Sequence, residues 1–382
     1  MKPKVSFVVP CYKLAHYLSE CVNSILMQTY EDFEILIMDD CSPDNTPEVA
    51  RSFKDPRVKH IRNEPNLGHL RNYNKGIALS QGEYIWLISA DDSLRRPHAL
   101  ERYLQVMDDQ PCVGYILCAG VGLRDYQETG ILGNYYYGDR DKIFDGSRFI
   151  SRVLKTGGIL SPSVMARKEC YEKLAFPLDM PHQGDMYLWL MWALEYDVAY
   201  LAEPMVRYRL HDENMTTIMN LNAPMQIMKD ELAVLWKTKH AASQKGFRAL
   251  ERQLEHSIAR KYAYAVTQRT YEDMGFPYKM TVQECEESIR SSAIRDEVAD
   301  TRSTFYTLLA DEYWWRGHFR NARHFYFLAL RNRLLLPKVW VALFLTYLGN
   351  VGFGVRKAQA HMRQRLRRYS NSSGTDTVPT SA

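Results

Sequence analysis

The feature that most constrains this chain is a hydrophobic segment that ends in two adjacent acids, Tyr84-Ile85-Trp86-Leu87-Ile88-Ser89-Ala90-Asp91-Asp92. The apolar run is typical of a buried strand, and open α/β sheets keep their ligand crevice at the carboxyl ends of strands. Two neighbouring carboxylates repel each other unless a cation or a proton lies between them. The pair therefore indicates a divalent-metal site that holds a phosphorylated substrate. The alternative is local: Asp91 caps a helix near Pro97, and Asp92 is a solvated turn residue.

The first 110 residues alternate strand and helix patterns at short spacing. Short β-rich segments separated by helices of about ten residues predict a doubly wound α/β fold with a mostly parallel sheet and right-handed crossovers. The expected strands are 5–9, 33–38, 58–62 and 84–88, and the expected helices are 15–28, 46–53 and 67–80.

The pattern changes beyond residue 110. A further strand at 114–119, an aromatic loop at 130–138, a helix at 185–196 and strands at 197–201 and 205–210 are expected. Helical periodicity replaces strand signals after a break at 220–224. We therefore expect a first domain over 1–222, an all-helical C-terminal domain over 223–369 and a disordered, Ser/Thr/Pro-rich tail over 370–382.

Composition bounds the cellular setting. The chain has 382 residues, which is long enough for one large core and a second unit. Its seven scattered cysteines form no CxxC pair, which favours a reduced, cytoplasmic compartment. The first apolar run, 5–9, is too short for a signal peptide.

Two other expected strands end in residues suited to nucleotide binding. Tyr12 follows the first strand and either stacks on a nucleobase or joins the core. Asp39 and Asp40 follow the second strand, where an acid can accept a hydrogen bond from a base or a ribose hydroxyl. The alternative for this second segment is turn chemistry with helix capping by Asp44 or Thr46.

Two downstream segments supply further polar groups. Asp185 comes directly before an apolar helix, so it is either an N-cap or, if it faces the crevice of Asp91 and Asp92, a general base. Strand alternation puts Arg209 and His211 on one face, where a cation and an imidazole suit a pyrophosphate and a metal shell. By itself, a lone His is more often a structural hydrogen-bonding residue than a ligand.

These segments occur in the order and spacing of a known family. From Ser6 to about Asn214 the chain resembles the glycosyltransferase family 2 enzymes, which have the GT-A fold and are inverting transferases that use nucleotide-sugar donors. Each segment alone is weak, but the ordered series over roughly 210 residues is specific. The resemblance is carried by Val9-Pro10-Cys11-Tyr12, Asp39-Asp40-Cys41-Ser42-Pro43-Asp44-Asn45-Thr46, Asn66-Leu67-Gly68, Asn74-Lys75-Gly76-Ile77, Gly82-Glu83-Tyr84-Ile85, Ser89-Ala90-Asp91-Asp92, Asp185 and Tyr208-Arg209-Leu210-His211.

The resemblance implies roles for the matching residues. Asp185 would be the base that deprotonates the acceptor hydroxyl. Asp92 would bind a divalent metal, Mn²⁺ or Mg²⁺, with His211 as a further ligand, and Asp91 would contact the metal or the ribose. One in-line displacement needs one base and one electrophile on the leaving phosphate, without a covalent nucleophile. The residues that would hold the donor, with Tyr12 and Asp40 at its base, are Pro10, Tyr12, Asp40, Arg71, Asp91 and Arg209.

The sequence departs from the family pattern at several positions. Ser89 stands where many members have the first acid of an Asp-x-Asp-Asp run, which leaves open which acid touches the metal. Tyr73 stands where an Arg is common, and Arg71 points about 200° away from it on a helix. Lys13 replaces a usual Asn, and Gly184 replaces a usual acid.

The helical end differs in charge from the rest of the chain. Residues 313–369 include twelve Arg and Lys and no Asp or Glu, whereas the remainder has a net charge of about −8. Residues 339–355 are uncharged but short for a spanning helix, which needs about twenty apolar residues. Such an end predicts a monotopic helix on an anionic membrane surface; the alternative is a buried helix with a solvated basic tail. One tetratricopeptide-like hairpin pattern, without a second copy, is formed by Gly317, Ala322, Tyr326 and Ala329.

The sequence thus predicts a metal-dependent, inverting, hexosyltransferase-type enzyme, peripheral on the inner face of the cell membrane. It would move a sugar from a nucleotide-sugar donor, with UDP favoured, to a glycan or lipid-linked glycan in surface polysaccharide biosynthesis. The alternative is a non-catalytic nucleotide-sugar-binding or helical scaffold protein derived from a transferase. A nucleotidyltransferase is disfavoured because a Gly-rich, Lys-bearing phosphate loop is lacking, and no nucleic-acid module is recognised. The sequence does not specify the donor sugar, the acceptor, the linkage or the oligomeric state.

Overall fold

The computed structural model describes residues 2–132, 137–212, 214, 217–218, 222–267, 279–294 and 297–372. Contacts within the chain divide it into two units, Met1–Leu254 and Glu255–Ala382. The division lies downstream of the expected 222/223 boundary, because helix α10 (Pro224–Gln244) packs on α8 (Gly184–Ala193) of the first unit.

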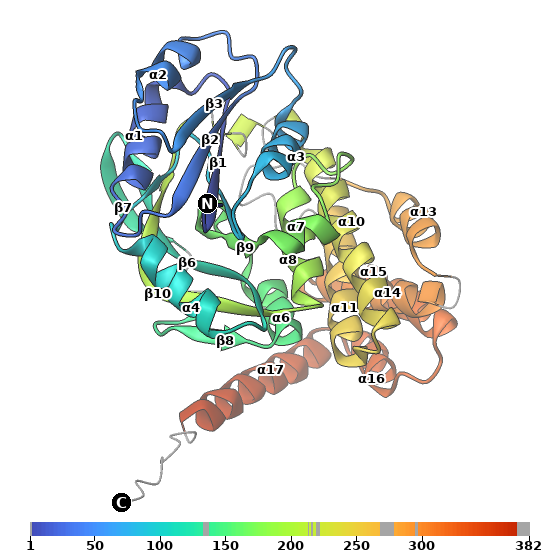
Figure 1. Cartoon of the computed structure of the whole chain (residues 1–382). Helices are drawn as coiled ribbons and strands as arrows, with labels where there is room; N and C mark the ends of the chain where they lie inside the picture. Colours follow the sequence, from blue (N-terminus) through green and yellow to red (C-terminus); the bar gives the residue numbers. More distant parts are fainter. Residues whose placement is uncertain are drawn as a thin grey trace, which may run out of the picture. The chain divides into compact units, whose positions relative to one another are not determined.

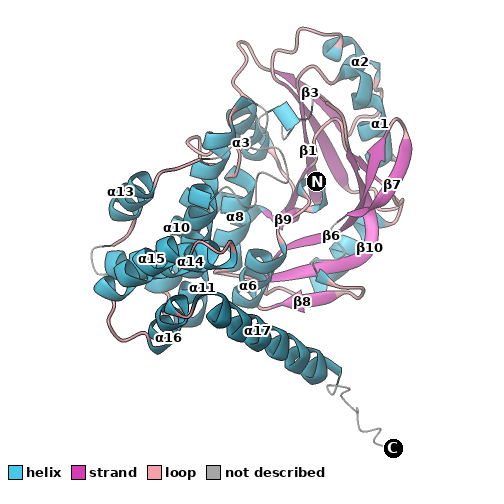
Figure 2. Cartoon of the chain, turned by 180° about the vertical axis from the view of Figure 1, so that it is seen from behind, coloured by secondary structure: helices cyan, strands magenta, loops and turns pink. Residues whose placement is uncertain are grey.

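The described part of the first unit contains one mixed, ten-stranded sheet (Figures 1 and 2). Along the sheet the order is β3-β2-β1-β4-β9-β6-β10-β5, with β7 paired to β6 and β8 to β10. The strands are β1 (Val5–Cys11), β2 (Phe33–Asp39), β3 (Val58–Arg62), β4 (Tyr84–Leu87), β5 (Ser93–Leu94), β6 (Val113–Arg124), β7 (Gln127–Leu132), β8 (Lys142–Phe144), β9 (Met165–Arg167) and β10 (Asp197–Arg209).

Helices join these strands and cover the sheet (Figure 1). The helices of the first unit that precede α10 are α1 (Ala15–Leu26), α2 (Thr46–Ser52), α3 (His69–Leu79), α4 (Ala99–Asp109), α6 (Gly146–Thr156), η1 (Ser161–Ser163), α7 (Lys168–Lys173) and α8. The predicted α/β fold with a helical C-terminal region is confirmed.

Parallel pairing brings the functional turns to one edge of the sheet. Val5 of β1 is in register with Phe33 of β2 and with Tyr84 of β4, so the three strands end close together. The structure differs from the sequence expectation in two places. The expected strands 197–201 and 205–210 are one strand, β10, with register shifts along its pairing with β6. Strand β7 extends into the expected loop 130–138. Its side chains are mostly exposed, so its sequence lacks the alternation of apolar residues that would have predicted a strand.

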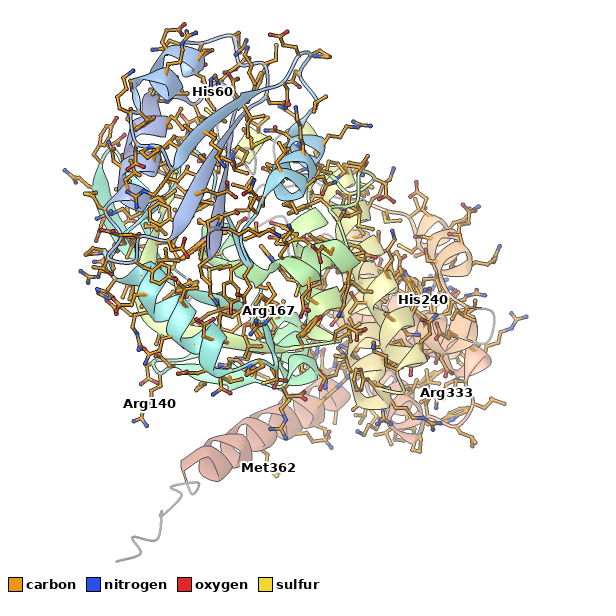
Figure 3. The ribbon with its side chains drawn as sticks, viewed as in Figure 1. His60, Arg140, Arg167, His240, Arg333 and Met362 are labelled. Atoms are coloured by element: carbon orange, nitrogen blue, oxygen red, sulfur yellow. The ribbon has the colours of Figure 1, made fainter. Side chains whose placement is uncertain are left out.

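A stack of buried aromatic rings fixes the strand that carries the paired acids. The Trp86 ring lies 5.5 Å from Phe7 of β1 and 4.3 Å from Tyr103 of α4, stacked in both cases. Its indole N–H also donates to the Pro162 carbonyl oxygen at 2.8 Å. Arg167 of β9, labelled in Figure 3, donates to the Val113 carbonyl oxygen at 2.8 Å and ties β9 to β6. Burial of these large side chains holds β4 rigidly below the pocket described next.

The second unit is helical in its described part. It contains the end of α11 (Arg248–Thr267), α13 (Val282–Ser292), α14 (Val298–Trp315), α15 (Phe319–Asn332), α16 (Pro337–Tyr347) and α17 (Gly349–Ser372). Helices α14 and α15 form the hairpin that the sequence pattern indicated, with Gly317 at a positive φ of 78° in its turn. The uncharged run 339–355 is split between α16 and α17. None of the described helices has both the length and the apolar character required to cross a bilayer.

Gly82, two residues before β4, is tightly enclosed. A Cβ atom there would lie 2.6 Å from the Ser6 backbone nitrogen and 2.8 Å from the Val5 carbonyl carbon. Main-chain atoms cannot move aside easily, so we expect Gly82→Ala to lower the free energy of unfolding by about 1–3 kcal/mol in urea titrations. Gly158→Ala is the matched control, because no atom lies within 4 Å of its added methyl group. Equal stability of the two variants would contradict this packing.

Candidate active site

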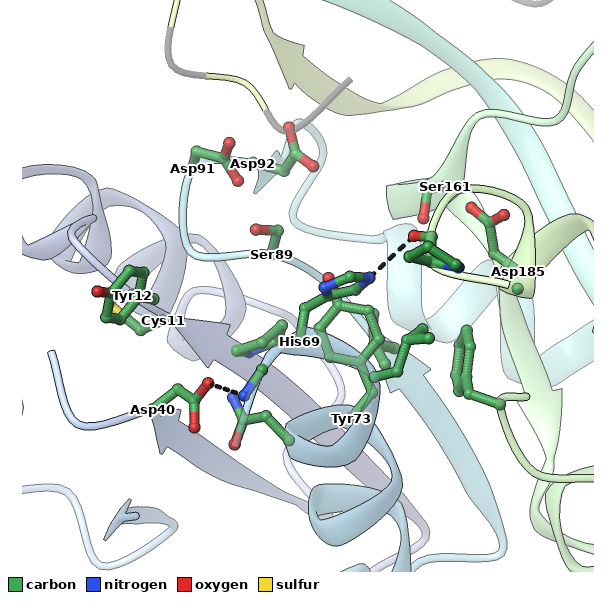
Figure 4. Close-up of a pocket in the computed structure, with 18 of the residues that line it drawn as sticks. Cys11, Tyr12, Asp40, His69, Tyr73, Ser89, Asp91, Asp92, Ser161 and Asp185 are labelled. Atoms are coloured by element: carbon green, nitrogen blue, oxygen red, sulfur yellow. Dashed lines mark hydrogen bonds between the residues drawn. The ribbon is translucent and has the colours of Figure 1, made fainter. Parts of the chain in front are cut away.

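A pocket of about 510 Å³ lies at the carboxyl ends of the parallel strands of the first unit. The turns after β1, β2 and β4 line it, together with the first residues of α3 and α8 (Figure 4). It brings together four acids from separate stretches of the sequence: Asp40, Asp91, Asp92 and Asp185.

The turn after β4 presents the paired acids to this pocket. The Asp92 N–H donates to the Ser89 carbonyl oxygen at 3.0 Å. The Asp92 carboxylate accepts a hydrogen bond from the Arg209 N–H at 3.0 Å, so β10 holds the turn from one side. Burial, and then the charge of Asp91 beside it, raises the pKa of Asp92 well above its usual range. The ionised form of Asp92 is therefore disfavoured in this turn, and either a proton or a bound cation would relieve the repulsion.

Asp91 supplies a carboxylate oxygen that lacks a partner. Its Oδ2 lies 3.0 Å from His211 Nε2, whereas its Oδ1 is buried without a hydrogen-bond partner among the described atoms. Such an oxygen is unfavourable unless a cation or a proton meets it. The donor set suits a divalent cation that takes its other ligands from phosphate and water. Within the described residues, no three His, Cys, Asp or Glu side chains are grouped to enclose an ion by themselves.

Arg209 lies behind the paired acids and does not line the pocket. Its Nε donates to the Asp91 carbonyl oxygen at 2.8 Å, and its guanidinium pairs with Glu20 at 2.5 Å. The guanidinium carbon also lies 4.3 Å from the centre of the Tyr17 ring. The sequence predicted that Arg209 binds the donor. In the structure, its Nε and one terminal nitrogen of its guanidinium hydrogen-bond behind the turn instead.

Tyr12 and Asp40 lie at the end of the pocket away from Asp185 (Figure 4). The Tyr12 side chain is 44% exposed, so a ligand can reach its ring, and Pro10 lies beside it in the lining. Asp40 is buried and accepts hydrogen bonds from the N–H groups of Leu67 and Gly68, at 2.8 and 2.9 Å. Asp40 thus shapes the loop before α3, besides facing the pocket.

Asp185 opens helix α8 at the other end of the pocket. Gln183 is the N-cap residue, so the capping alternative for Asp185 is not observed. The Met186 N–H donates to Asp185 Oδ1 at 2.6 Å. Burial raises the pKa of Asp185 to about 6. A carboxylate with this pKa is ionised at neutral pH and is still basic enough to accept a proton in a reaction.

Tyr73 is electrostatically coupled to both groups of acids. Burial raises the pKa of its hydroxyl, and the charges of Asp91, Asp185 and Asp92 raise it further. The sequence analysis noted Tyr73 only as a departure from the family pattern. Tyr73 stands where an Arg is common in the family, so this side of the pocket lacks the positive charge of that Arg.

Two histidines in the pocket wall were not recognised from the sequence. His69 Nε2 donates to the Pro181 carbonyl oxygen at 2.9 Å (Figure 4). His182 Nε2 is buried without a partner among the described atoms. Burial lowers the pKa of both side chains, so both are neutral at pH 7. Neither residue has a local pattern that separates it from an ordinary loop histidine.

The charge of the lining is strongly one-sided. Where the structure describes the chain, no Lys or Arg side chain lines the pocket. The residues of the first unit that the structure does not describe, 1, 133–136, 213, 215–216 and 219–221, include neither Lys nor Arg. Arg71, expected on the donor side, is exposed on α3 outside the lining, and Lys75 donates to Asn63 Oδ1 at 2.6 Å. The described lining therefore offers a diphosphate no Lys or Arg side chain to pair with.

Comparisons with known proteins agree with this geometry. Residues 6–173 match the family model "Glycosyl transferase family 2". An uncharacterized glycosyltransferase of Haemophilus influenzae is 30% identical over 57% of this chain and 69% of its own length. TuaG of Bacillus subtilis, named for teichuronic acid biosynthesis, is 27% identical over 56% of this chain and 82% of its own. The chain spans less than half the length of several other curated relatives.

Solved structures share the fold. The structure of S. aureus TarS 1-349 in complex with UDP-GlcNAc superimposes with a TM-score of 0.57 at 17% identity, over 87% of this chain and 89% of that chain. Together, the family model over residues 6–173 and the Haemophilus relative, which is 30% identical and covered over 69% of its length, show that the chain belongs to glycosyltransferase family 2.

Proposed function

We propose that this protein is a metal-dependent, inverting glycosyltransferase of hexosyltransferase type. It moves a sugar from a nucleotide-diphosphate donor to a hydroxyl group of a glycan or lipid-linked glycan. The observation that carries the proposal is a single pocket that Asp185, with its raised pKa, shares with the Asp91–Asp92 turn. A base on the acceptor side and a cation site on the leaving-group side are what one displacement requires.

Asp185 is the residue that we assign to the acceptor. Its carboxylate takes the proton of the acceptor hydroxyl while that oxygen forms a bond to the anomeric carbon of the donor. On the opposite face, the bond from the anomeric carbon to the diphosphate oxygen breaks, and the diphosphate leaves with the electron pair. Because the attack and the departure occur on opposite faces, the configuration is inverted and no covalent enzyme intermediate is required.

The cation site is assigned to Asp91, Asp92 and His211. The unpartnered Asp91 Oδ1 and the neighbouring imidazole fit Mn²⁺ or Mg²⁺, and Asp92 adds a second carboxylate in the same turn. When bound, the cation would offset the charge that develops on the leaving diphosphate. The lack of Lys and Arg among the described lining residues supports this assignment.

The donor is proposed to be a UDP-sugar. TarS, which shares the fold, is described in complex with UDP-GlcNAc, and the name of TuaG refers to teichuronic acid biosynthesis. We therefore place the reaction in the synthesis of a bacterial surface polysaccharide. The base of the donor would lie at Tyr12 and Asp40, next to Pro10, and its ribose near Asp91.

We also propose that the protein is cytoplasmic and binds the inner face of the membrane peripherally. Helix α16 exposes Trp340, Phe344 and Tyr347, which lie on one face at helical spacing. The surrounding stretch, 313–369, contains basic residues and no acids. Exposed aromatic side chains flanked by positive charge suit the interface of an anionic bilayer.

The first functional test removes the proposed base. Asp185→Asn should lower kcat by at least about a hundredfold, because the amide cannot accept the proton, while affinity for the donor is retained. Transfer or donor hydrolysis with a panel of nucleotide sugars gives the rates, and calorimetry with UDP and Mn²⁺ gives the affinity. Asp179→Asn is the control, because that exposed carboxylate lies outside the described lining and 3.7 Å from Lys237. Full activity of Asp185→Asn would show that another residue is the base.

In the unchanged enzyme, kcat should rise as the pH increases through about 6, because Asp185 loses its proton in that range.

The second test concerns the cation. With Mn²⁺ present, UDP should raise the melting temperature of the protein, because a ligand that binds only the folded state stabilises it by about 2.7 kcal/mol at a hundred times Kd. Chelation by EDTA should abolish the shift, and so should Asp91→Ala. Asp32→Ala, at an exposed position before β2, should keep it. A shift that persists in Asp91→Ala would refute the assignment of this residue, and nucleotide binding without any turnover would favour a non-catalytic role.

The third test concerns the membrane. The protein should co-sediment with vesicles that contain phosphatidylglycerol and bind less to vesicles of phosphatidylcholine alone. Phe344→Ser should weaken vesicle binding about tenfold, because one exposed aromatic anchor is lost. Met27→Ser, which removes a 67% exposed apolar side chain from the first unit, is the control. Equal binding of the two variants, or dissociation of a dimer by Phe344→Ser, would assign α16 a different partner.

A further inference from the structure

We infer that the sugar unit that carries the accepting hydroxyl is uncharged. This inference rests on the proposed function and adds the chemical class of the acceptor to it. Three properties of the pocket wall around Asp185 lead to it: fixed negative charge, the lack of Lys and Arg among the described lining residues, and an aromatic surface.

Negative charge is built into the wall. Asp185 itself lines the pocket next to His182. Behind His182 lies Asp230, which is 1% exposed and accepts a hydrogen bond from the His182 N–H at 2.9 Å. The second bond to Asp230 comes from Gln226, at 2.7 Å, and carries no positive charge. His69 and His182 are neutral at pH 7 for the reason given above, so they do not balance these carboxylates.

Two lysine side chains of the first unit, Lys173 and Lys237, contact partners other than the pocket acids. Lys173 donates to the Tyr196 hydroxyl, and Lys237 lies 3.7 Å from Asp179. Neither side chain belongs to the described lining. A carboxylate or phosphate on the acceptor sugar would therefore face Asp185 without a counter-charge. At a separation of about 6 Å and an effective dielectric constant of about 20, the repulsion corresponds to roughly a hundredfold loss in binding.

Aromatic rings in the pocket wall, rather than charged groups, would attract the acceptor sugar. The Phe176 ring lies 5.4 Å from Tyr73 and 6.3 Å from Tyr171, and all three line the pocket together with Trp189. Flat, largely apolar rings suit the C–H face of a pyranose, and a few polar groups then fix its orientation. Ser161, which lies near Asp185 in Figure 4, is one such group.

The test compares acceptors that differ only in charge. Stereochemically matched pairs are glucose and glucuronate, galactose and galacturonate, and N-acetylglucosamine and its 6-phosphate. They are offered to the full-length protein with Mn²⁺ and the UDP-sugar that it hydrolyses fastest. We expect kcat/KM for the neutral member of a productive pair to exceed that of the anionic member about a hundredfold. Equal or better use of the anionic member overturns the inference.

A charge introduced into the wall provides the complementary measurement. Ser161→Arg should reduce the preference for the neutral acceptor at least about tenfold, because the new cation offsets the carboxylates. Ser161→Gln, which adds bulk without charge, should preserve the preference. An unchanged preference in a Ser161→Arg protein that still hydrolyses the donor counts against the electrostatic origin.

Donor hydrolysis distinguishes a failure of the acceptor inference from a failure of the proposed function. If the protein hydrolyses a UDP-sugar but none of the neutral sugars accepts or accelerates its turnover, the acceptor inference fails and the proposed function stands. If neither hydrolysis nor transfer occurs with any nucleotide sugar, the proposed function itself fails.

Discussion

Two carboxylates held side by side in a buried turn are the constraint on which the pocket depends. Asp91 and Asp92 repel each other, and burial strengthens that repulsion by removing water. The turn keeps its shape because Arg209 holds it from behind, through its N–H to Asp92 and its guanidinium to the Asp91 carbonyl oxygen. Glu20 and the Tyr17 ring in turn fix the guanidinium. An oxygen of Asp91 is thereby held buried without a hydrogen-bond partner among the described atoms, and we propose that a cation meets it.

The rest of the site follows from this arrangement. A pocket lined by four acids, without Lys or Arg among its described lining residues, cannot bind a diphosphate by direct charge pairing. In the reaction that we propose, a cation accompanies the nucleotide, so donor binding and metal binding are one event. At the far end, burial keeps Asp185 basic, and the lack of Lys and Arg among the described lining residues makes the wall, in our proposal, unsuited to an anionic acceptor. One charge pattern therefore bears on the donor, the base and the acceptor together.

The second unit has an exposed apolar face on helix α16. Helix α16 packs one side on α15 and leaves aromatic and aliphatic side chains exposed on the other. Exposed apolar surface of this kind is unusual unless a partner covers it. Because residues 313–369 contain basic residues and no acids, an anionic lipid surface is the partner that we propose for this face.

Much of the fold was determined by the sequence alone. The first strands and helices lie within about two residues of the ranges expected from periodicity, because buried parallel strands and amphipathic helices have strong local patterns. Strand β7 and the continuity of β10 were missed, since exposed or interrupted strands acquire their structure from their neighbours rather than from their own pattern. The acids Asp40, Asp91, Asp92 and Asp185 could be named from motifs at strand and helix ends. Only the tertiary structure could show that Arg209 supports the turn from behind, that Arg71 lies outside the lining, and that Tyr73, His69 and His182 form the wall. Those outcomes depend on which side chains from distant segments compete for the same buried space and the same hydrogen-bond donors, and no local stretch of sequence contains that information.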